Sequence, residues 1–198
     1  MKKIAIYGGS FNPIGKHHIM IANQLLKHMD EVWITPCYKS ITGKNMEDDI
    51  HRVNMCLKAI KNNNNNKIKL CDFEIKNKMH DESYNILSKF LDHYFDGSYR
   101  NKFYFVIGSD NALTINTWEN WEKLINMIPF IVIPRPSYNI PLDHWCMKYP
   151  HIYFPDIELC DHSSTQIRKE LKENKHTDLV DLSVMDYIKN NCLYEFDK

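Results

Sequence analysis

The sequence has no long apolar run and no excess of charge of either sign. No window of its 198 residues approaches the roughly 18 to 20 consecutive apolar residues of a membrane span, and the N-terminus lacks the apolar core of a signal peptide. The 25 basic side chains are balanced by 25 acidic ones, which leaves no net positive charge to hold DNA or RNA. We therefore expect a soluble, cytoplasmic protein with neither a membrane nor a nucleic acid as partner. A local basic cluster still suits a small phosphate ligand.

The cysteine and histidine spacings of metal sites are missing too. The six cysteines include no C-x-x-C pair and have no histidines at the spacing of zinc ligands, which favours reduced thiols. The ten histidines are dispersed apart from His17-His18, and neighbouring side chains diverge on a helix. We expect no metal ion held by protein side chains.

Short apolar runs alternate with segments of helical periodicity along the chain. The predicted strands cover residues 3–7, 31–35, 67–75, 103–108, 130–133 and 151–154. The predicted helices cover residues 17–29, 50–60, 84–94 and 118–125, and two later helices carry Ile167 with Leu171 and Val184 with Ile188. This alternation predicts a single domain over residues 1–198 with a doubly wound α/β fold: a mostly parallel sheet with helices on both faces, and a C-terminal helical part over about 162–198.

Polar residues mark the ends of several of these elements. Five asparagines, Asn62 to Asn66, are expected to form an exposed loop without a catalytic role, because a polar homopolymer buries little surface. The expected helix caps are Asp81 or Ser83, a capping box of Asn116 with Glu119, and a side chain of the segment Asp161 to Thr165.

Segments compatible with phosphate binding follow several predicted strands. The pair Gly8-Gly9 lies between a strand and a helix start, where the backbone can approach a ligand and free N–H groups face an anion. Gly108 to Asp110 and Arg135 end later strands, and Ser163 to Arg168 open a later helix. Because ligands of doubly wound folds bind at the carboxyl ends of strands, we expect these four segments to converge on one crevice. Neither G-x-x-x-x-G-K-(S/T) nor G-x-G-x-x-G is present, which disfavours a P-loop kinase or a dinucleotide oxidoreductase.

Each candidate side chain has a structural interpretation beside the functional one. His18 is either a solvated histidine at a helix start or a donor to phosphate oxygens. Arg168 and the nearby hydroxyl groups either belong to a well-capped helix or surround a polyphosphate, for which a guanidinium is well suited. Trp118 and Trp121 are either core residues at helical spacing or, for one of them, a platform for a flat ring.

These segments together resemble the nicotinate and nicotinamide mononucleotide adenylyltransferases of the nucleotidyltransferase superfamily. Residues Gly8 to Ile14 look like that family's opening Gly-Gly-(Ser/Thr)-Phe-(Asp/Asn)-Pro signature, and Ser163 to Arg168 is similar to its closing Ser-Ser-Thr-x-Ile-Arg. Gly108-Ser-Asp110 followed by Trp118, and the segments 51–55 and 83–85, fall in the order that the family requires. The resemblance covers nearly the whole chain and implies a Rossmann-like nucleotidyltransferase fold and a role in NAD biosynthesis.

The resemblance also implies a reaction and a set of site residues. The phosphate of nicotinate mononucleotide would attack the α-phosphorus of ATP, which carries Mg²⁺, to give deamido-NAD and pyrophosphate. No protein nucleophile is needed, because the site has only to align two anions and absorb developing charge. The implied residues are His18, Arg168 and Lys16 for catalysis; Gly8, Gly9, Ser10, Phe11, Gly108, Asp110, Ser164, Thr165 and Ile167 for ATP and its phosphates; and Lys44, Asn85, Trp118 and Arg135 for the mononucleotide.

The sequence departs from the family pattern at one place. Bacterial relatives read H-x-G-H, many eukaryotic ones have threonine first, and here residues 15 to 18 read Gly-Lys-His-His. His18 keeps the final histidine, whereas Gly15 removes an expected phosphate contact. The hypothesis is that Lys16, a cation on a flexible stem, substitutes for it.

Several alternatives stay open. A dual-specificity or nicotinamide-mononucleotide enzyme fits the same motifs. A phosphopantetheine adenylyltransferase is disfavoured, because a pantetheine arm offers no flat ring for Trp118. A regulator that kept the crevice but lost activity would bind nucleotide without releasing pyrophosphate. The oligomeric state, a homo-oligomer included, is not determined by the sequence.

Overall fold

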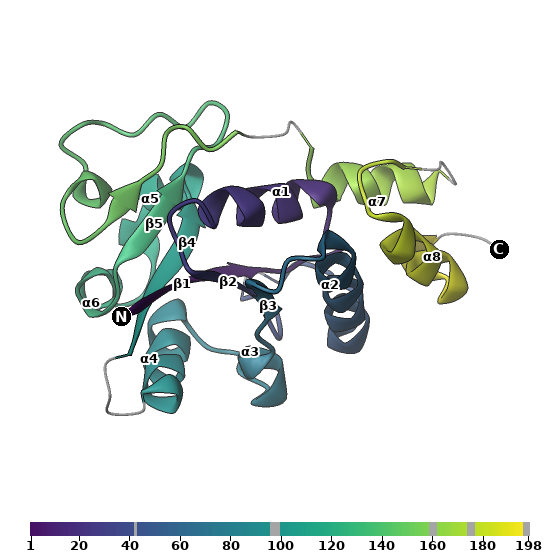
Figure 1. The fold of residues 1–198 in the computed structure, drawn as a ribbon, viewed down its shortest axis with the longest axis horizontal. Helices are drawn as coiled ribbons and strands as arrows, with labels where there is room; N and C mark the ends of the chain where they lie inside the picture. The colour runs from purple at the N-terminus through teal and green to yellow at the C-terminus, as the bar shows by residue number, and fades with distance from the viewer. Residues whose placement is uncertain (42, 96–99, 159–161, 174–176, 196–198) are drawn as a thin grey trace.

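The centre of the molecule is a six-stranded sheet in the order β3-β2-β1-β4-β5-β6, and its neighbouring strands are parallel (Figure 1). This computed structural model describes residues 1–41, 43–95, 100–158, 162–173 and 177–195. The strands are β1 (Lys2–Gly9), β2 (Glu31–Pro36), β3 (Ile68–Leu70), β4 (Asn101–Gly108), β5 (Phe130–Ile133) and β6 (Ile152–Tyr153). The predicted doubly wound α/β fold is confirmed.

The strand order reverses between β1 and β4. From β1 the chain proceeds through β2 to β3 at one edge, then returns to β4 on the other side of β1 and continues to β6 at the opposite edge. The pairs Ile4↔Phe103 and Tyr7↔Val106 set the register of the two central strands. Their carboxyl ends, Gly9 and Gly108, therefore lie at the switch point where sheets of this kind bind ligands.

Helices cover both faces of the sheet and enclose two cores. One core holds α1 (Lys16–Leu25), α2 (Asp49–Asn63), α7 (Ser164–Lys172) and α8 (Leu182–Asn190); the other holds α3 (Phe73–Lys76), α4 (Ser83–Tyr94), α5 (Ser109–Thr114) and α6 (Trp121–Met127). Strand β1 serves both cores, because Ala5 and Tyr7 face the first and Ile4 and Ile6 face the second. The C-terminal helices α7 and α8 continue the layer of α1 and α2 (Figure 1).

The predicted strand over 67–75 is wrong in its second half. Only Ile68–Leu70 pairs with β2, and Phe73–Lys76 forms the short helix α3. The buried Phe73 ring packs edge-on against Phe90 at 5.5 Å, and the Glu74 carboxylate turns inward to accept the Tyr38 N–H. Alternating apolar and polar residues fit one helical turn as well as a strand, so this tertiary contact decides the conformation.

The asparagine run is largely exposed, as predicted, but its first two residues belong to a helix and not to a loop. Asn62 and Asn63 form the last residues of α2, and Asn64 ends the helix with a left-handed backbone, φ 52° and ψ 31°. The Asn62 amide donates to Asp181 at 2.6 Å, and Asn63 exchanges hydrogen bonds with Asn23 of α1. The expectation of a loop overlooked that asparagine amides can pair with other polar groups and that asparagine tolerates the left-handed conformation at a helix end.

Several predicted helix ends also differ from the structure. The helix over 17–29 stops at Leu25, and α6 begins at Trp121 without the predicted capping box, because Ile115–Thr117 is a 3-10 turn and Trp118 is extended. Helix α4 has Glu82 at its N-cap and no side-chain cap. Ser163 caps α7 by accepting the Gln166 N–H, whereas Asp161 lies outside the described residues.

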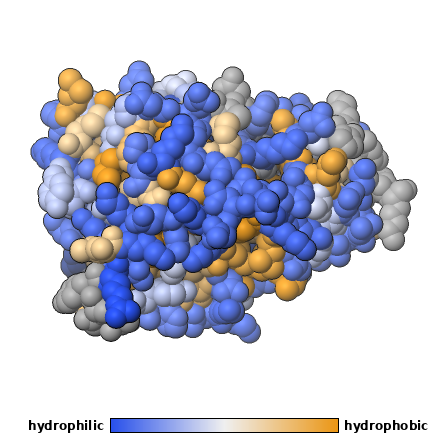
Figure 2. All heavy atoms as spheres, viewed as in Figure 1, coloured by the Kyte–Doolittle hydropathy of each residue, from blue (hydrophilic) through white to orange (hydrophobic). Residues whose placement is uncertain are grey.

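The outer surface is predominantly polar. Hydrophilic side chains cover most of the face drawn in Figure 2, and hydrophobic side chains show there as smaller areas between them. None of the helices that the structure describes has the length and apolar character needed to cross a bilayer.

Candidate active site

The loop after β1 forms the base of the site. A Cβ atom at Gly8 would lie 3.3 Å from the Phe105 ring, and one at Gly9 would lie 3.2 Å from the Phe11 ring, so both positions are tight for a side chain. Phe11 has φ 45°, an unusual conformation for an aromatic residue, and its ring is 2% exposed. The loop therefore presents the backbone of Gly8 to Ser10, while the Phe11 side chain belongs to the core beneath it.

His18 is held in one tautomer by the chain itself. The Gly15 N–H donates to His18 Nδ1 at 2.9 Å, so Nδ1 acts as acceptor and the proton of the neutral ring is on Nε2. Burial lowers the pKa of His18 well below its usual range, and His17 and Arg135 lower it further. The Phe11 ring packs edge-on against His18 with 5.0 Å between centroids. Near neutral pH His18 thus offers an Nε2–H donor and no positive charge.

Helix α7 is joined to the same loop by its first residues. Ser164 donates its hydroxyl to the Pro13 carbonyl at 2.9 Å, and Arg168 donates from Nη1 to the Asn12 carbonyl at 2.7 Å. Arg168 Nη2 also donates to the Thr165 hydroxyl at 3.2 Å. The structure therefore brings the opening and closing motifs together, with a guanidinium between them, although they lie about 150 residues apart in the sequence.

The ends of β4 and β5 contribute an acid and a base. Asp110 Oδ1 lies 3.9 Å from Arg135 Nε, and the Ser109 hydroxyl accepts the Arg135 N–H at 2.9 Å. A Cβ atom at Gly108 would meet Asp110 Oδ1 and would lie 2.9 Å from Arg135 Nε, so both side chains use the space that glycine leaves. Arg135 does not line the cavity described next, although the resemblance assigned it to the mononucleotide. Its charge is one of the smaller causes that lower the pKa of His17 and of His18.

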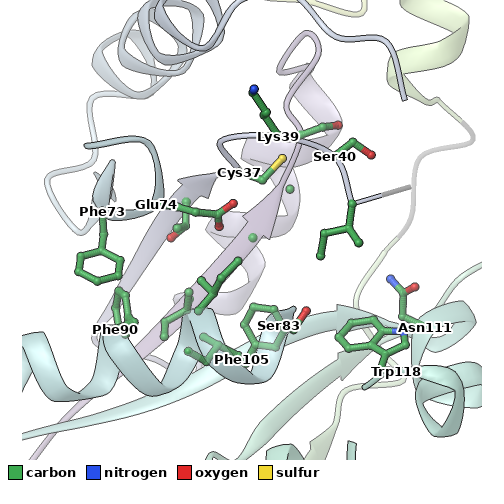
Figure 3. A pocket seen from close by; sticks show the side chains of 18 of the residues that line it. Cys37, Lys39, Ser40, Phe73, Glu74, Ser83, Phe90, Phe105, Asn111 and Trp118 are labelled. Carbon is green, nitrogen blue, oxygen red and sulfur yellow. The ribbon is translucent and has the colours of Figure 1, made fainter. Parts of the chain in front are cut away.

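A cavity of about 360 Å³ opens beside the loop after β1 (Figure 3). Gly8, Gly9 and Ser10 form part of its wall, so the cavity adjoins the loop after β1. Its apolar floor comes from Leu87, Phe90 and Phe105. Trp118 and Asn111 lie together at one side, while Lys39, Ser40 and Lys44 line it from the loop after β2.

Glu74 is an acidic residue of this cavity that sequence analysis did not select. Its carboxylate accepts the Tyr38 N–H at 2.8 Å and points into the cavity next to Cys37 (Figure 3). Burial raises the pKa of Glu74 to about 7, although the Tyr38 N–H and Arg52 lower it in part. Glu74 was missed because the sequence predicted a strand over 67–75, and a polar residue of a half-buried strand is expected on its solvent side.

Arg52 is a second residue whose role was missed. Its side chain is fully buried on α2 and donates to the carbonyls of Ser10, Tyr38 and Glu47, each at 2.9 Å. Since Ser10 follows β1 and Tyr38 follows β2, one guanidinium fixes both loops that surround the cavity. The segment 51–55 contributed to the family resemblance, but nothing local to it indicates these distant partners.

Four of the expected residues point elsewhere. Lys16 is exposed and lines a different cavity, between α1, α2 and Asp181. The Asn85 amide donates to Asp81 at 2.8 Å, and Ser83, not Asn85, lines the cavity beside the loop after β1. The side chains of Phe11 and Ile167 are buried in the core. Within the described residues, no group of three or more metal-binding side chains occurs.

Comparisons with known proteins identify a family and relatives of this chain. The cytidylyltransferase-like family model matches residues 6–170. Nicotinate-nucleotide adenylyltransferase of Bacillus subtilis is 32% identical over 200 residues, covering 98% of this chain and 100% of the relative. A probable nicotinate-nucleotide adenylyltransferase of Fusobacterium nucleatum is 34% identical and covers 87% and 89% of the two chains.

A solved structure agrees over the whole chain. The nicotinic acid mononucleotide adenylyltransferase of Plasmodium falciparum, complexed with NaAD, superposes with a TM-score of 0.80 at 30% identity and covers 100% of this chain and 99% of its own. With this coverage in both sequence and structure, the chain belongs to the cytidylyltransferase-like family of nucleotidyltransferases and, within it, to the nicotinate-nucleotide adenylyltransferases.

Proposed function

We propose that this enzyme transfers the adenylyl group of Mg·ATP to nicotinate mononucleotide, giving deamido-NAD and pyrophosphate. The observation that carries the proposal is that the loop after β1 serves two places: Gly8 to Ser10 form part of the wall of the apolar cavity that Trp118 lines, and Asn12 accepts a hydrogen bond from Arg168. We take His18, Arg168 and this loop as the phosphate-binding cluster. A mononucleotide has a phosphate for this cluster and a flat ring for the cavity. The relatives named above carry the same activity in their names.

In the reaction, a phosphate oxygen of the mononucleotide forms a bond to the α-phosphorus of ATP. The bond from that phosphorus to the bridging oxygen of the β-phosphate breaks, and pyrophosphate leaves with the electron pair. The Nε2–H of His18, the guanidinium of Arg168 and the backbone N–H group of Ser10 stabilise the charge that develops on these oxygens. Mg²⁺ would be carried by ATP and would neutralise part of the phosphate charge, so few protein carboxylates would be needed to hold it.

The two substrates occupy opposite sides of the loop after β1. The adenosine side is formed by Gly108, Asp110 and the N-terminal turn of α7, next to Arg135. The mononucleotide lies in the cavity, with its ring against Trp118 and its phosphate towards Lys39 and Lys44. This arrangement brings the attacking phosphate and the α-phosphate together above Gly9.

A nicotinate carboxylate suits the cavity through helix α4. This helix of 12 residues starts at Ser83, which lines the cavity. Among the described residues, Asp81 accepts the Glu82 N–H and the Asn85 side-chain amide, and no side-chain cap is bound to the N–H groups of the first turn. The free N–H groups and the positive end of the helix dipole therefore favour a carboxylate over a carboxamide.

The test is a pyrophosphate-release assay with Mg·ATP and each of three acceptors: nicotinate mononucleotide, nicotinamide mononucleotide and phosphopantetheine. We expect the highest kcat/KM with the first. Preference for the nicotinamide substrate would overturn the acid specificity, and turnover only with phosphopantetheine would overturn the acceptor class. Tight binding of ATP without pyrophosphate release from any acceptor would indicate a regulator that has lost catalysis.

A further inference from the structure

His17 is a buried histidine next to the phosphate-binding cluster, and one of its ring nitrogens has no hydrogen-bond partner among the described residues. Its side chain is 6% exposed, and its Nδ1 atom accepts no hydrogen bond within the described residues. Its ring lies against that of His18, with 3.8 Å between centroids and 39° between planes. The neighbouring histidines of α1 therefore do not diverge as helical spacing suggested.

The ring of His17 fills the space that a side chain at residue 15 would enter. A Cβ atom built on Gly15 would lie 2.7 Å from both Cε1 and Nδ1 of His17, and 2.8 Å from Cδ1 of Ile167. Contacts this short require one of these groups to shift. Gly15 and His17 are thus structurally linked: the imidazole of residue 17 occupies the position that a side chain of residue 15 would otherwise take.

Few buried polar atoms of the described residues lack a hydrogen bond, and His17 Nδ1 is one of them. Another is Asp110 Oδ1, which still has the Arg135 guanidinium at 3.9 Å. Since buried polar groups are normally hydrogen-bonded, an imidazole with an unpaired nitrogen at this depth indicates a role beyond packing.

The surroundings keep His17 uncharged. Burial, with smaller contributions from Arg135 and His162, lowers the pKa of His17 to about 4, and its ring neighbour His18 is neutral as well. Because Nδ1 has no hydrogen-bond acceptor among the described residues, the favourable place for the ring proton is Nε2, and His17 is then an Nε2–H donor.

We propose that His17 is a second histidine donor to the triphosphate of ATP, beside His18, in the space that Gly15 leaves free. This assignment rests on the proposed function, since it takes the triphosphate as the ligand of the cluster. Two neutral rings side by side donate to anionic oxygens without the repulsion that two imidazolium ions would have. Lys16, whose side chain is exposed on another cavity, is the competing substitute.

The experiment compares His17→Ala with a double variant, Gly15→His/His17→Gly, in which the imidazole is moved to residue 15. Mg·ATP affinity is measured by calorimetry, and kcat and both KM values by pyrophosphate release. His28→Ala is the matched control, because His28 is an exposed histidine just beyond the C-terminal end of α1. Thermal unfolding and circular dichroism of each variant establish that it is folded.

We expect His17→Ala to lose at least about tenfold in kcat/KM for ATP with KM for the mononucleotide within about twofold of wild type, and the double variant to regain most of the loss. His28→Ala should behave as wild type. Unchanged ATP affinity and turnover in folded His17→Ala would overturn the assignment, as would an equal loss for both substrates. Loss of ATP affinity in Lys16→Ala with none in His17→Ala would assign the role to Lys16 instead. Calorimetry with Mg·ATP tests His17 even if the wild-type enzyme fails to use nicotinate mononucleotide, so the two proposals fail separately.

Discussion

The hydrogen bond from Gly15 N–H to His18 Nδ1 gives that histidine a fixed role as a neutral donor. A neutral ring contributes most where charge develops during the reaction, because its N–H needs no reorganisation when the α-phosphate becomes more negative.

We expect His18→Ala to lower kcat by at least about 10²-fold with the fold retained by circular dichroism, since a contact to the transition state is lost. The measurement is pyrophosphate release at saturating substrates. His28→Ala serves as control here as well. Turnover near wild type in His18→Ala would show that its ring does not touch the reacting phosphates.

Trp118 is expected to act on the mononucleotide alone. Trp118→Ala removes a face against which the pyridine ring can stack, so KM for nicotinate mononucleotide should rise about tenfold while KM for ATP stays within about twofold. Trp121→Ala is the matched control, because Trp121 lies three residues further on and does not line the cavity. A selective loss of ATP affinity in Trp118→Ala would place the indole on the other substrate's side.

The raised pKa of Glu74 predicts that mononucleotide binding depends on pH. Its pKa is raised from 4.5 to about 7, so the carboxyl group is mostly neutral below pH 7 and adds a negative charge to the cavity above it. Because the mononucleotide is an anion, its KM should increase as the pH rises from 6 to 8.5. Glu74→Gln should flatten this increase, whereas Glu158→Gln, a change at an exposed residue, should leave it intact. The same slope in Glu74→Gln would assign the titration to another group.

At the residue scale, sequence reasoning located groups that belong to contiguous motifs. The glycine pair lines the cavity, His18 accepts the Gly15 N–H, and Arg168 of the closing motif donates to Asn12 of the opening one; their roles toward substrate stay predictions. Sequence reasoning missed Arg52 and Glu74, because their roles depend on contacts with residues far away in the sequence, such as Ser10 and Tyr38. It missed His17 because the place of this ring depends on the absence of a side chain at Gly15.

At the scale of elements, Arg52 connects helix α2 with the loops after β1 and β2. Arg52→Lys keeps the charge but cannot reach three carbonyls in a fork, so buried acceptors lose their partners. We expect the free energy of unfolding to fall by about 2–3 kcal/mol and kcat/KM to fall for both substrates. Denaturant unfolding and steady-state kinetics measure the two effects. The exposed substitution Arg100→Lys should change neither, and an Arg52→Lys enzyme as stable as wild type would contradict the role of the fork.

Elements were predictable where the apolar pattern allowed one interpretation. The run Phe103 to Gly108 is buried on both faces of β4 and was identified correctly, because a continuous β-branched and aromatic run of this length suits a central parallel strand. In the segment Asp72 to Ile75, polar and apolar residues alternate over too few positions to distinguish a strand from a helical turn. The packing of Phe73 on Phe90 determines that it is helical.

At the scale of the whole molecule, one carboxylate connects three strands at the end of the sheet opposite the candidate active site. Glu31 of β2 binds Lys2 of β1 at 2.8 Å and Lys69 of β3 at 2.7 Å, and accepts the Trp33 indole N–H at 2.8 Å. Burial by itself would raise its pKa, but the hydrogen bonds from Lys2, Lys69 and Trp33 together lower it to about 2. Three adjacent strands are therefore joined by a charge that persists to low pH.

The folded-state pKa of Glu31 lies below its usual 4.5, so the stabilisation is complete above pH 4.5 and is lost as the pH falls towards 2. Both lysines are about half exposed, and solvent screens the pairs. We expect Glu31→Gln to lower the free energy of unfolding by about 1–2 kcal/mol at pH 7, and by progressively less below pH 4. Urea unfolding at both pH values measures this, with the exposed Glu122→Gln as control. A difference between Glu31→Gln and wild type that stays constant down to pH 2.5 would contradict it.

The asparagine run has a consequence for how the chain tolerates changes in length. Asn62 and Asn63 bind Asp181 and Asn23, and Asn64 turns the chain out of α2. An asparagine inserted anywhere among the five yields one and the same sequence, in which the first two still meet their partners and the third still ends the helix. The added length is then taken up by the short turn before β3. Relatives that differ only in the number of these asparagines should therefore share the same helix end, the same contacts to α1 and Asp181, and the same stability to within a few tenths of a kcal/mol.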